Sequence, residues 1–257
     1  MIKLVYVIVR RPDLSSEAFT DYWLNRHGPL VAAHAEALRL RKYVQSHLVE
    51  HPSNEAMRAA RGMLPAADGV TEVWWDSLAD FQAAYATPSG GAAGAALAED
   101  EATFIDFSRS CVFMTEEHPI FDRTGGEALG PDALKVTYLL ARRNDLDQAA
   151  CHATWLKDHG PLVASFAEVL HMAKYVQSHT ITPELNAGFQ AGRGYEPPLD
   201  GITEVWVNSL ADLGRGGETE AGRHASAALV GDERRFVQMD ASRCFLTREH
   251  LIFDHTA

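Results

Sequence analysis

The stretch RHGPLV at residues 26–31 returns as DHGPLV at residues 158–163, an offset of 132 positions. The same offset carries YVQSH at 43–47 onto YVQSH at 175–179, and no insertion is needed anywhere. Further pairs at this offset are GVTEVW at 69–74 with GITEVW at 201–206, and EHPIFD at 117–122 with EHLIFD at 249–254. Each copy has the size of a domain and is far longer than a solenoid repeat. The sequence therefore predicts two fused copies of one domain.

The joint between the copies is predicted at residues 123–132, where RTGGEALGPD has the glycine and proline content of a linker. The two domains would then cover residues 1–122 and 133–257.

Bulk properties exclude several classes of partner. The net charge is −12, which argues against nucleic acid and against an anionic membrane surface. No apolar run approaches the roughly 20 residues of a membrane span. The apolar N-terminus is closed by Arg10-Arg11-Pro12, so it is predicted to be a strand and not a signal peptide. Three cysteines without C-x-x-C spacing indicate a cytoplasmic protein without a disulfide framework.

The first copy shows an alternation of strands and helices. The expected strands are residues 3–10, 42–49, 70–75 and 104–115, and the expected helices are residues 16–24, 30–40 and 77–85. Gly28-Pro29 is predicted to break the first helical stretch, and residues 50–68 are predicted to be a loop. The order β-α-β-β-α-β is that of the ferredoxin-like unit, an α+β fold.

Such a unit has both helices on one face of its sheet, and the other face must be covered. A second copy on the same chain supplies that cover at high effective concentration. We therefore expect the two ferredoxin-like domains to pair their sheets face to face as an intramolecular α/β barrel.

The motifs HGPLV, YVQSH and DGVTEVWWDSLADF resemble those of EthD-type domains of the dimeric α/β-barrel superfamily. The resemblance covers nearly the whole chain, twice. It implies a ferredoxin-like fold and barrel pairing, here between two repeats of one chain. It does not choose a function, because relatives in the wider superfamily include polyketide cyclases, dehydratases, lactone isomerases and cofactor-free monooxygenases.

His27 and its counterpart His159 lie just before the Gly-Pro that should break the helix. A kink there could aim the imidazole across the sheet, and histidine is suited to proton transfer near neutral pH. The alternative is an imidazole that binds the carbonyl groups of the broken helix end.

A second set of candidates alternates along the second strand of each copy, so that its members share one face. The set consists of Tyr43, Gln45 and His47, with Tyr175, Gln177 and His179 in the second copy. Buried polar groups need partners. They bind a ligand, or they form a satisfied network between the sheets of the barrel.

Glu72 lies in an apolar strand and shares a face with Trp74, and Glu204 with Trp206 repeats this arrangement. A buried carboxylate either pairs with a basic group or has a raised pKa. A proton relay with a histidine of the neighbouring strand and a structural pair with Arg10 are both consistent with the sequence.

Tyr6 and Tyr138 could donate a phenol hydrogen bond to the same cavity, or they could be ordinary core residues. Trp23 and His34 are expected to line the cavity. Two histidines and a glutamate could ligate a metal, but no H-x-D/E spacing supports this and we expect none. Nucleotide-binding motifs are absent too, so no cofactor is expected.

The copies differ around this shared set. Trp75 becomes Val207, and the helix with Phe81 and Tyr85 becomes LGRGG at residues 213–217, a poor helix former. Either both pockets work on different faces of one substrate, or one is the working site and the other is scaffold. The first copy is slightly favoured, because it keeps the aromatic lining.

These observations predict a cofactor-independent acid/base enzyme of the lyase, dehydratase or isomerase type. Its substrate would be a small apolar, aromatic or polyketide-like molecule. His27 or His47 would be the base, Glu72 its orienting group, and Tyr43 or Tyr6 the oxyanion donor. The alternatives are a non-catalytic binding protein of an oxygenase system, and a cofactor-free or metal-dependent oxygenase. A homodimer of the whole chain stays open.

Overall fold

A computed structural model describes residues 1–256 as two halves of matching element order. The first half contains β1 (Ile2–Ile8), α1 (Ser16–Tyr22), a π-helical turn (Trp23–His27), α2 (Gly28–Ala33), β2 (Lys42–Leu48), α3 (Pro52–Arg61), β3 (Gly69–Trp75), α4 (Leu78–Tyr85), α5 (Pro88–Glu101), a 3₁₀ turn (Phe107–Arg109) and β4 (Cys111–Asp122). The second half contains β5 (Leu134–Leu140), α6 (Gln148–Thr154), a π-helical turn (Trp155–His159), α7 (Gly160–Phe166), β6 (Met172–Thr180), α8 (Pro183–Arg193), β7 (Gly201–Val207), α9 (Leu210–Glu218), α10 (Glu220–Glu233), a 3₁₀ turn (Met239–Ala241) and β8 (Arg243–Asp254). The predicted second domain ends at residue 257, which lies outside the described residues, and both domain boundaries stay predictions.

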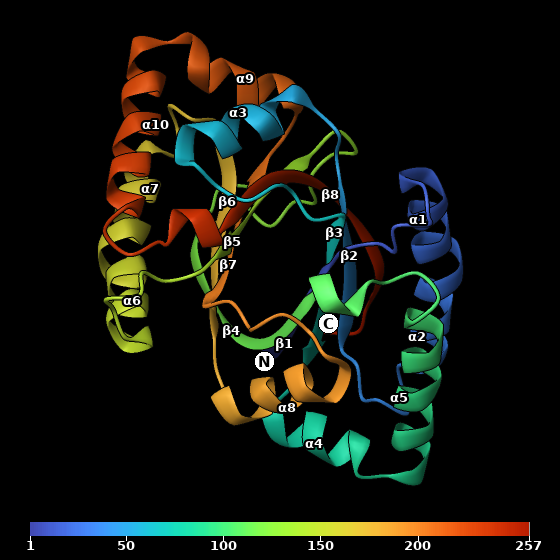
Figure 1. Ribbon diagram of the computed structural model, residues 1–257. Helices are drawn as coiled ribbons and strands as arrows, with labels where there is room; N and C mark the ends of the chain where they lie inside the picture. Colours follow the sequence, from blue (N-terminus) through green and yellow to red (C-terminus); the bar gives the residue numbers. More distant parts are fainter. Residues whose placement is uncertain (257) are drawn as a thin grey trace.

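The strands form one closed barrel in the order β1-β3-β2-β8-β5-β7-β6-β4. Antiparallel pairing of β2 with β8 and of β4 with β6 joins the halves at both edges. Figure 1 looks into this barrel, with helices around it. The predicted α+β fold, an intramolecular barrel of two ferredoxin-like halves, is confirmed. The sheet faces that carry no helices face each other across the barrel interior, and the edge strands of the two sheets are joined by hydrogen bonds.

Strand alternation divides the side chains between the barrel interior and the outer, helix-covered face. Val5, Phe113, Leu139 and Phe245 pack with one another in the interior. Outward-facing residues pack instead against the helices, as Tyr43 does with Val31 of α2.

One helix of each half packs over the sheet of the other half. Figure 1 shows α3 beside α9 and α10, and α8 beside α4. The Asn54 side chain of α3 accepts a hydrogen bond from the backbone N–H of Leu246, 2.8 Å away, and Asn186 of α8 does the same for Met114, at 2.9 Å. The space above each sheet is therefore covered by residues of both halves.

The predicted helix break at Gly28-Pro29 is wrong. The chain stays helical from α1 into α2 through one π-helical turn, in which the Gly28 N–H bonds the carbonyl of Trp23. Pro29 stands in the first turn of α2, where a missing N–H donor costs little. The same turn recurs at Trp155–His159.

Two helices of the first half, α3 and α5, were not expected, and α8 and α10 repeat them in the second half. Residues 50–68 contain α3, which begins at Pro52 after a side-chain cap by His51. The glycine- and alanine-rich residues 88–101 form α5, which is capped by Thr87. Even the segment at 213–217 is helical within α9, because tertiary packing overrides a low propensity. The last strand of the first half is also later than predicted, at Cys111–Asp122.

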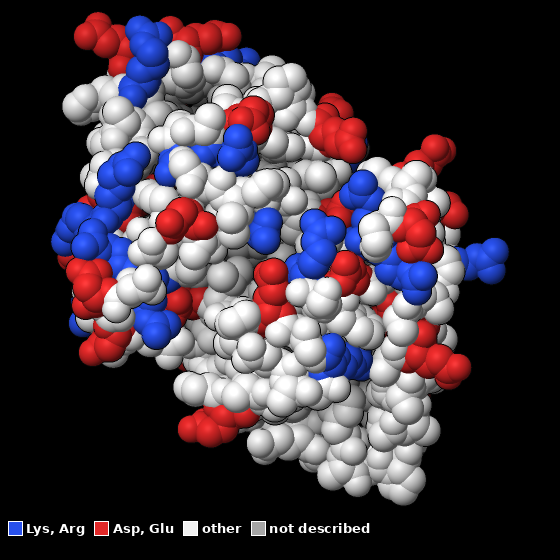
Figure 2. Space-filling model, in the orientation of Figure 1, with Lys and Arg blue, Asp and Glu red and all other residues white. Residues whose placement is uncertain are grey.

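Among residues 1–256, no helix is long and apolar enough to cross a membrane. Figure 2 shows charged side chains of both signs interspersed over one face of the molecule. The lower right of that face, over α4 and α5, is free of charge, and residues 81–98 there contain no Asp, Glu, Lys or Arg.

Candidate functional site

The barrel interior holds a buried cluster of lysines and glutamates. The Lys3 ammonium lies 3.2 Å from Glu72 and also pairs with Glu204, and the Lys135 ammonium lies 2.7 Å from Glu204 and also pairs with Glu72. All four side chains are at most 2 % exposed. Each lysine thus binds a glutamate of its own half and one of the other half.

Burial, followed by repulsion from Glu204, raises the pKa of Glu72 to about 7. Burial also acts on Glu204, but Lys135 and Lys3 outweigh it and lower the pKa of that carboxyl. Glu72 is therefore the more easily protonated carboxyl of the pair, which is held by lysines that the sequence patterns did not reveal.

Several predicted partners of Glu72 are wrong. In the β2–β3 register Glu72 stands opposite Val44, so Tyr43, Gln45 and His47 point to the other face. Arg10 pairs with Asp68 instead. The His–Glu relay and the two-His-one-carboxylate metal site are thereby excluded.

Trp74 and Trp206 also face the interior, where they are not positioned to bind a ligand of the outer face. The Trp74 indole N–H donates to Glu117 at 2.9 Å, and the Trp206 indole does the same to Glu249. Glu249 forms with Glu72 and Glu204 the one group of potential metal ligands found among residues 1–256, and Lys135 contacts all three carboxylates.

The alternating set on β2 forms a hydrogen-bonded chain on the outer face of the barrel. The Gln45 amide donates to the carbonyl of Trp23 and to the Tyr43 hydroxyl, both at 2.8 Å, and accepts from His47 at 2.9 Å. The His47 ring stacks on Trp23 with centroids 4.2 Å apart. Burial, then the neighbouring His250, lowers the pKa of His47 to about 3, so this ring stays neutral.

The second half repeats this chain with Tyr175, Gln177, His179 and Trp155. Burial, then His152 and His118, lowers the pKa of His179 to about 2. A hydrogen-bonded network is thus present in both halves, but it lies between sheet and helices and not between the sheets. In the first half, His47 Nδ1 and Trp23 Nε1 are buried without a partner among the described residues.

His27 and His159 each pair with an aspartate of the long helix that packs beside them. His27 Nδ1 lies 2.7 Å from Asp100 on α5, and His159 Nδ1 lies 2.9 Å from Asp232 on α10. A carboxylate accepts, so Nδ1 carries the proton and Nε2 is left as the basic nitrogen. The alternative interpretation, in which each imidazole binds a carbonyl of the helix end, is therefore wrong for these Nδ1 atoms.

A cavity of about 840 Å³ lies over the outer face of the second-half sheet. Its floor includes Tyr138 of β5, Tyr175 of β6 and Thr203 of β7, and His159 is part of its wall. Its volume is in the range of small-molecule sites, roughly 300–1,000 Å³. Another hollow, of about 500 Å³, lies beside the linker and contains none of the predicted site residues.

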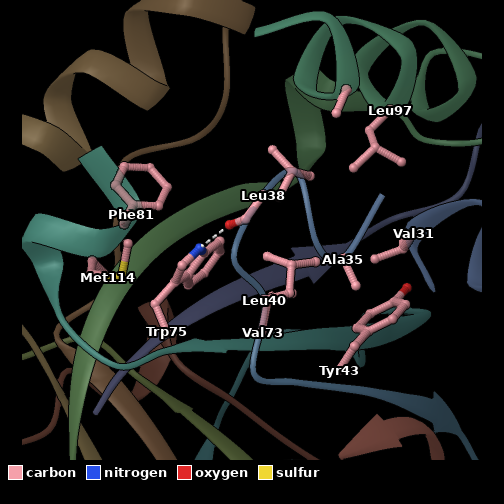
Figure 3. Close-up of a cluster of buried hydrophobic side chains, with 11 residues drawn as sticks. Val31, Ala35, Leu38, Leu40, Tyr43, Val73, Trp75, Phe81, Leu97 and Met114 are labelled. Atoms are coloured by element: carbon pink, nitrogen blue, oxygen red, sulfur yellow. Dashed lines mark hydrogen bonds between the residues drawn. The ribbon is translucent and has the colours of Figure 1, made fainter. Parts of the chain in front are cut away.

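The corresponding space in the first half is filled by aromatic side chains. Trp75 packs edge-on against Phe81 with centroids 5.1 Å apart, and Phe81 also contacts Tyr85 and Phe189. Figure 3 shows Trp75 and Phe81 among the buried side chains of this half, with the hydrogen bond from the Trp75 indole to the carbonyl of Leu38. Residues at the matching second-half positions are Val207, Leu213, Gly217 and Met57.

The cavity thus lies in the second half, whereas the aromatic lining had favoured the first copy, and which copy is the working site stays a prediction. The aromatic residues of the first copy fill the pocket instead of lining it, and the smaller residues of the second half open it. Of the predicted site residues, the structure brings Tyr138, His159 and Tyr175 together around the cavity. His34, at the end of α2, is not among the lining residues.

Sequence reasoning missed the residues of the cavity that come from α3 and α10. The Arg61 guanidinium of α3 binds Glu233 of α10 with two hydrogen bonds of 2.7 and 2.9 Å, and it lies 5.8 Å above the Tyr138 ring. The available signal was Pro52 ahead of an alanine-rich run, which is typical of a helix start.

The fold and the cavity define a class of protein: a fused α/β barrel with a cavity of small-molecule size on the outer face of one sheet. The chain belongs to the EthD family, as a tandem member, because the EthD domain profile matches residues 11–108 and 143–240.

Solved structures share the fold at low identity. A protein described as anthrone oxidase-like is 14 % identical, with a TM-score of 0.55, covering 100 % of this chain and 94 % of its own. A candidate monooxygenase from Fusobacterium nucleatum is 6 % identical with a TM-score of 0.50, covering 98 % and 92 %. An ethyl tert-butyl ether D family protein from Bacillus halodurans is 22 % identical, covering 46 % and 99 %, with a TM-score of 0.32. No curated protein matches the sequence.

Proposed function

We propose that the second-half cavity is the active site of a cofactor-independent acid/base enzyme acting on a small apolar, aromatic or polyketide-like molecule. The observation that carries this proposal is the apolar cavity with His159 in its wall, where Asp232 binds Nδ1 of that imidazole. Apolar walls bind the carbon skeleton, and one oriented imidazole moves a proton.

His159 is the general base in this proposal. Asp232 accepts a hydrogen bond from Nδ1–H, which fixes the tautomer in which Nε2 is free to take a proton from carbon. Burial raises the pKa of Asp232, but hydrogen bonds from Arg235 and His159 outweigh it and lower that pKa, so the partner stays a carboxylate.

The remaining predicted site residues take structural roles in the proposal. His47 and His179 stay neutral inside hydrogen-bonded chains, with Tyr43 and Tyr175 as further members. The barrel-centre glutamates hold the two halves together. His27 has the same aspartate pairing as His159, but the surrounding space is filled.

Proton removal from a carbon acid opens lyase, dehydratase and isomerase reactions, and it can also precede attack by oxygen. Anthrone is a suitable first probe, because its methylene carbon is acidic and a protein of the same fold carries the description anthrone oxidase-like. Exchange of the methylene hydrogens for deuterium in D₂O reports proton abstraction whatever the later steps are.

The test compares His159→Asn with His27→Asn. Asparagine can still donate to the aspartate but lacks Nε2, so we expect His159→Asn to lower the exchange rate by about 10²–10⁴-fold. His27→Asn should leave the rate unchanged. Equal rates in the wild type and His159→Asn would overturn the proposed base. Binding without exchange would favour a non-catalytic binding protein, and oxygen consumption would favour an oxygenase.

A further inference from the structure

The Tyr138 hydroxyl is a polar group of the cavity without a good hydrogen bond. Tyr138 is 7 % exposed, and its hydroxyl lies 3.5 Å from Glu233 Oε2 and 3.6 Å from the sulfur of Met239. The distance to Glu233 exceeds that of an ordinary O–H···O hydrogen bond, about 2.5–3.0 Å, and the thioether sulfur of Met239 is only a weak acceptor. A buried hydroxyl without a close partner costs about 1–3 kcal/mol.

Its counterpart Tyr6 has such a partner. The Tyr195 hydroxyl of the second half donates to the Tyr6 hydroxyl at 3.0 Å, and the Arg193 guanidinium donates to Tyr195 at 3.1 Å. The residue that matches Tyr195 by the offset of 132 is Met63, which has no hydroxyl. The second half has therefore kept the phenol and lost its partner.

The same half has also lost aromatic rings. Phe81, Tyr85 and Phe189 pack together above the first-half sheet, and their second-half counterparts are Leu213, Gly217 and Met57. At Gly217 a Cβ atom would meet nothing within 4 Å, so the space above this position is open. The filled half shows which groups fit the space over such a sheet, namely aromatic rings in edge and tilted contacts.

We propose that the ligand of the second-half cavity is a molecule of several fused aromatic rings with an oxygen attached to one of the rings, and that the Tyr138 hydroxyl donates a hydrogen bond to that oxygen. The ligand's rings take the space that Phe81, Tyr85 and Phe189 occupy in the first half. Its oxygen takes the place of the Tyr195 hydroxyl. This inference rests on the proposed function, for which it names the substrate class and a positioning residue.

The charges around Tyr138 favour a neutral ligand oxygen. Arg61 is already bound to Glu233 through two hydrogen bonds, so it has no free charge to offer an anion. Burial, then Glu233, raises the pKa of Tyr138 well above its ordinary value, so the phenol keeps its proton and can donate it. A ring carbonyl is the acceptor that matches this donor.

The test uses two probes with the same three-ring skeleton, anthrone and 9,10-dihydroanthracene, of which only anthrone has a carbonyl. Dissociation constants are measured by equilibrium dialysis for the full chain, for Tyr138→Phe and for the matched first-half control Tyr6→Phe. We expect Tyr138→Phe to weaken anthrone binding by about tenfold, the loss expected for one hydrogen bond. Dihydroanthracene should bind the wild type and Tyr138→Phe equally, and Tyr6→Phe should change neither affinity.

Equal anthrone affinity in the wild type and Tyr138→Phe overturns this inference and leaves the proposed function standing. A parallel loss of both ligands in Tyr138→Phe also overturns it, because the tyrosine would then act by packing alone. Failure of the wild type to bind either probe contradicts the ligand class. Weaker anthrone binding by Tyr138→Phe, with the wild-type rate of deuterium exchange once anthrone is saturating, supports this inference independently of the proposed base His159.

Discussion

The two halves are nearly alike inside the barrel and unlike outside it. At the centre, Lys3 and Lys135 make equivalent contacts with the same two glutamates. Above the sheets, the first half is packed with aromatic rings, whereas the second encloses a cavity of about 840 Å³.

This difference follows from which residues the halves share. Each central lysine binds carboxylates of both halves, so a change in one half would leave a buried charge of the other without its partner. The outer pockets are covered by separate sets of helices, and one can change while the other is kept. Fusion of the copies therefore allows the space over one sheet to be filled with side chains while the space over the other stays open for a ligand.

The largest expected effect tests the symmetry of the centre. Lys3→Met and Lys135→Met each remove one ammonium from a cluster of buried carboxylates. We expect each to lower the free energy of unfolding by about 3–5 kcal/mol, the cost of breaking a buried ion pair. Urea unfolding at pH 8 measures it.

The two losses should agree within about 1 kcal/mol, the spread expected from context. A much smaller loss in one variant would show that the centre, too, has become unequal.

A second prediction closes the cavity with the residues of the filled half. Leu213→Phe with Gly217→Tyr should weaken anthrone binding by at least about 100-fold, which corresponds to ~2.7 kcal/mol. The fold should hold, because replacing a helical glycine at open space removes a cost of about 0.5–1 kcal/mol. Thermal unfolding and equilibrium dialysis measure the two effects.

Gly192→Tyr is the matched control for this closure. Gly192 is an exposed helical glycine of α8 with nothing within 4 Å of a Cβ, and it does not line the cavity. It should leave anthrone affinity unchanged. Retained affinity in the closed variant would mean that the ligand binds elsewhere.

Much of the fold was predictable because it follows from short-range patterns. The offset of 132 and the strand alternation were sufficient to predict the paired barrel, and they placed Tyr43, Gln45 and His47 on one face. Which face a strand turns inward depends on partners far away in sequence. Glu72 was for that reason assigned to histidines of the neighbouring strand, when its partners are Lys3 and Lys135.

The half that contains the open cavity was not predicted from the sequence, for a related reason. Sequence shows that Phe81 and Tyr85 are aromatic, but not whether such rings line a space or occupy it. That depends on Phe189 and on α8, which arrive from the other half. Comparing residue volumes at matched positions, rather than ring content, would have indicated that the open space lies in the second half.

The smallest expected effect concerns pH and the two stacked histidines. Both pKa values are lowered in the folded chain, to about 3 for His47 and about 2 for His179, so the unfolded chain binds protons more readily. Their contribution to stability is complete above the unfolded pKa of about 6.5 and is lost as the pH falls below it. Burial of Glu72 acts in the opposite direction, so each histidine must be isolated by difference.

We expect the stability of the wild type, relative to His47→Gln or His179→Gln, to fall by about 1.5 kcal/mol between pH 6.5 and pH 5. Urea unfolding at both pH values measures this change. His118 and His152 surround His179. The folded pKa values of His47 and His179 nevertheless both lie well below pH 5, so the two variants should show the same loss of stability. A stability difference that does not change with pH would mean that these rings take up protons in the folded chain. A larger change in the second half would show that its histidine cluster has diverged along with its cavity.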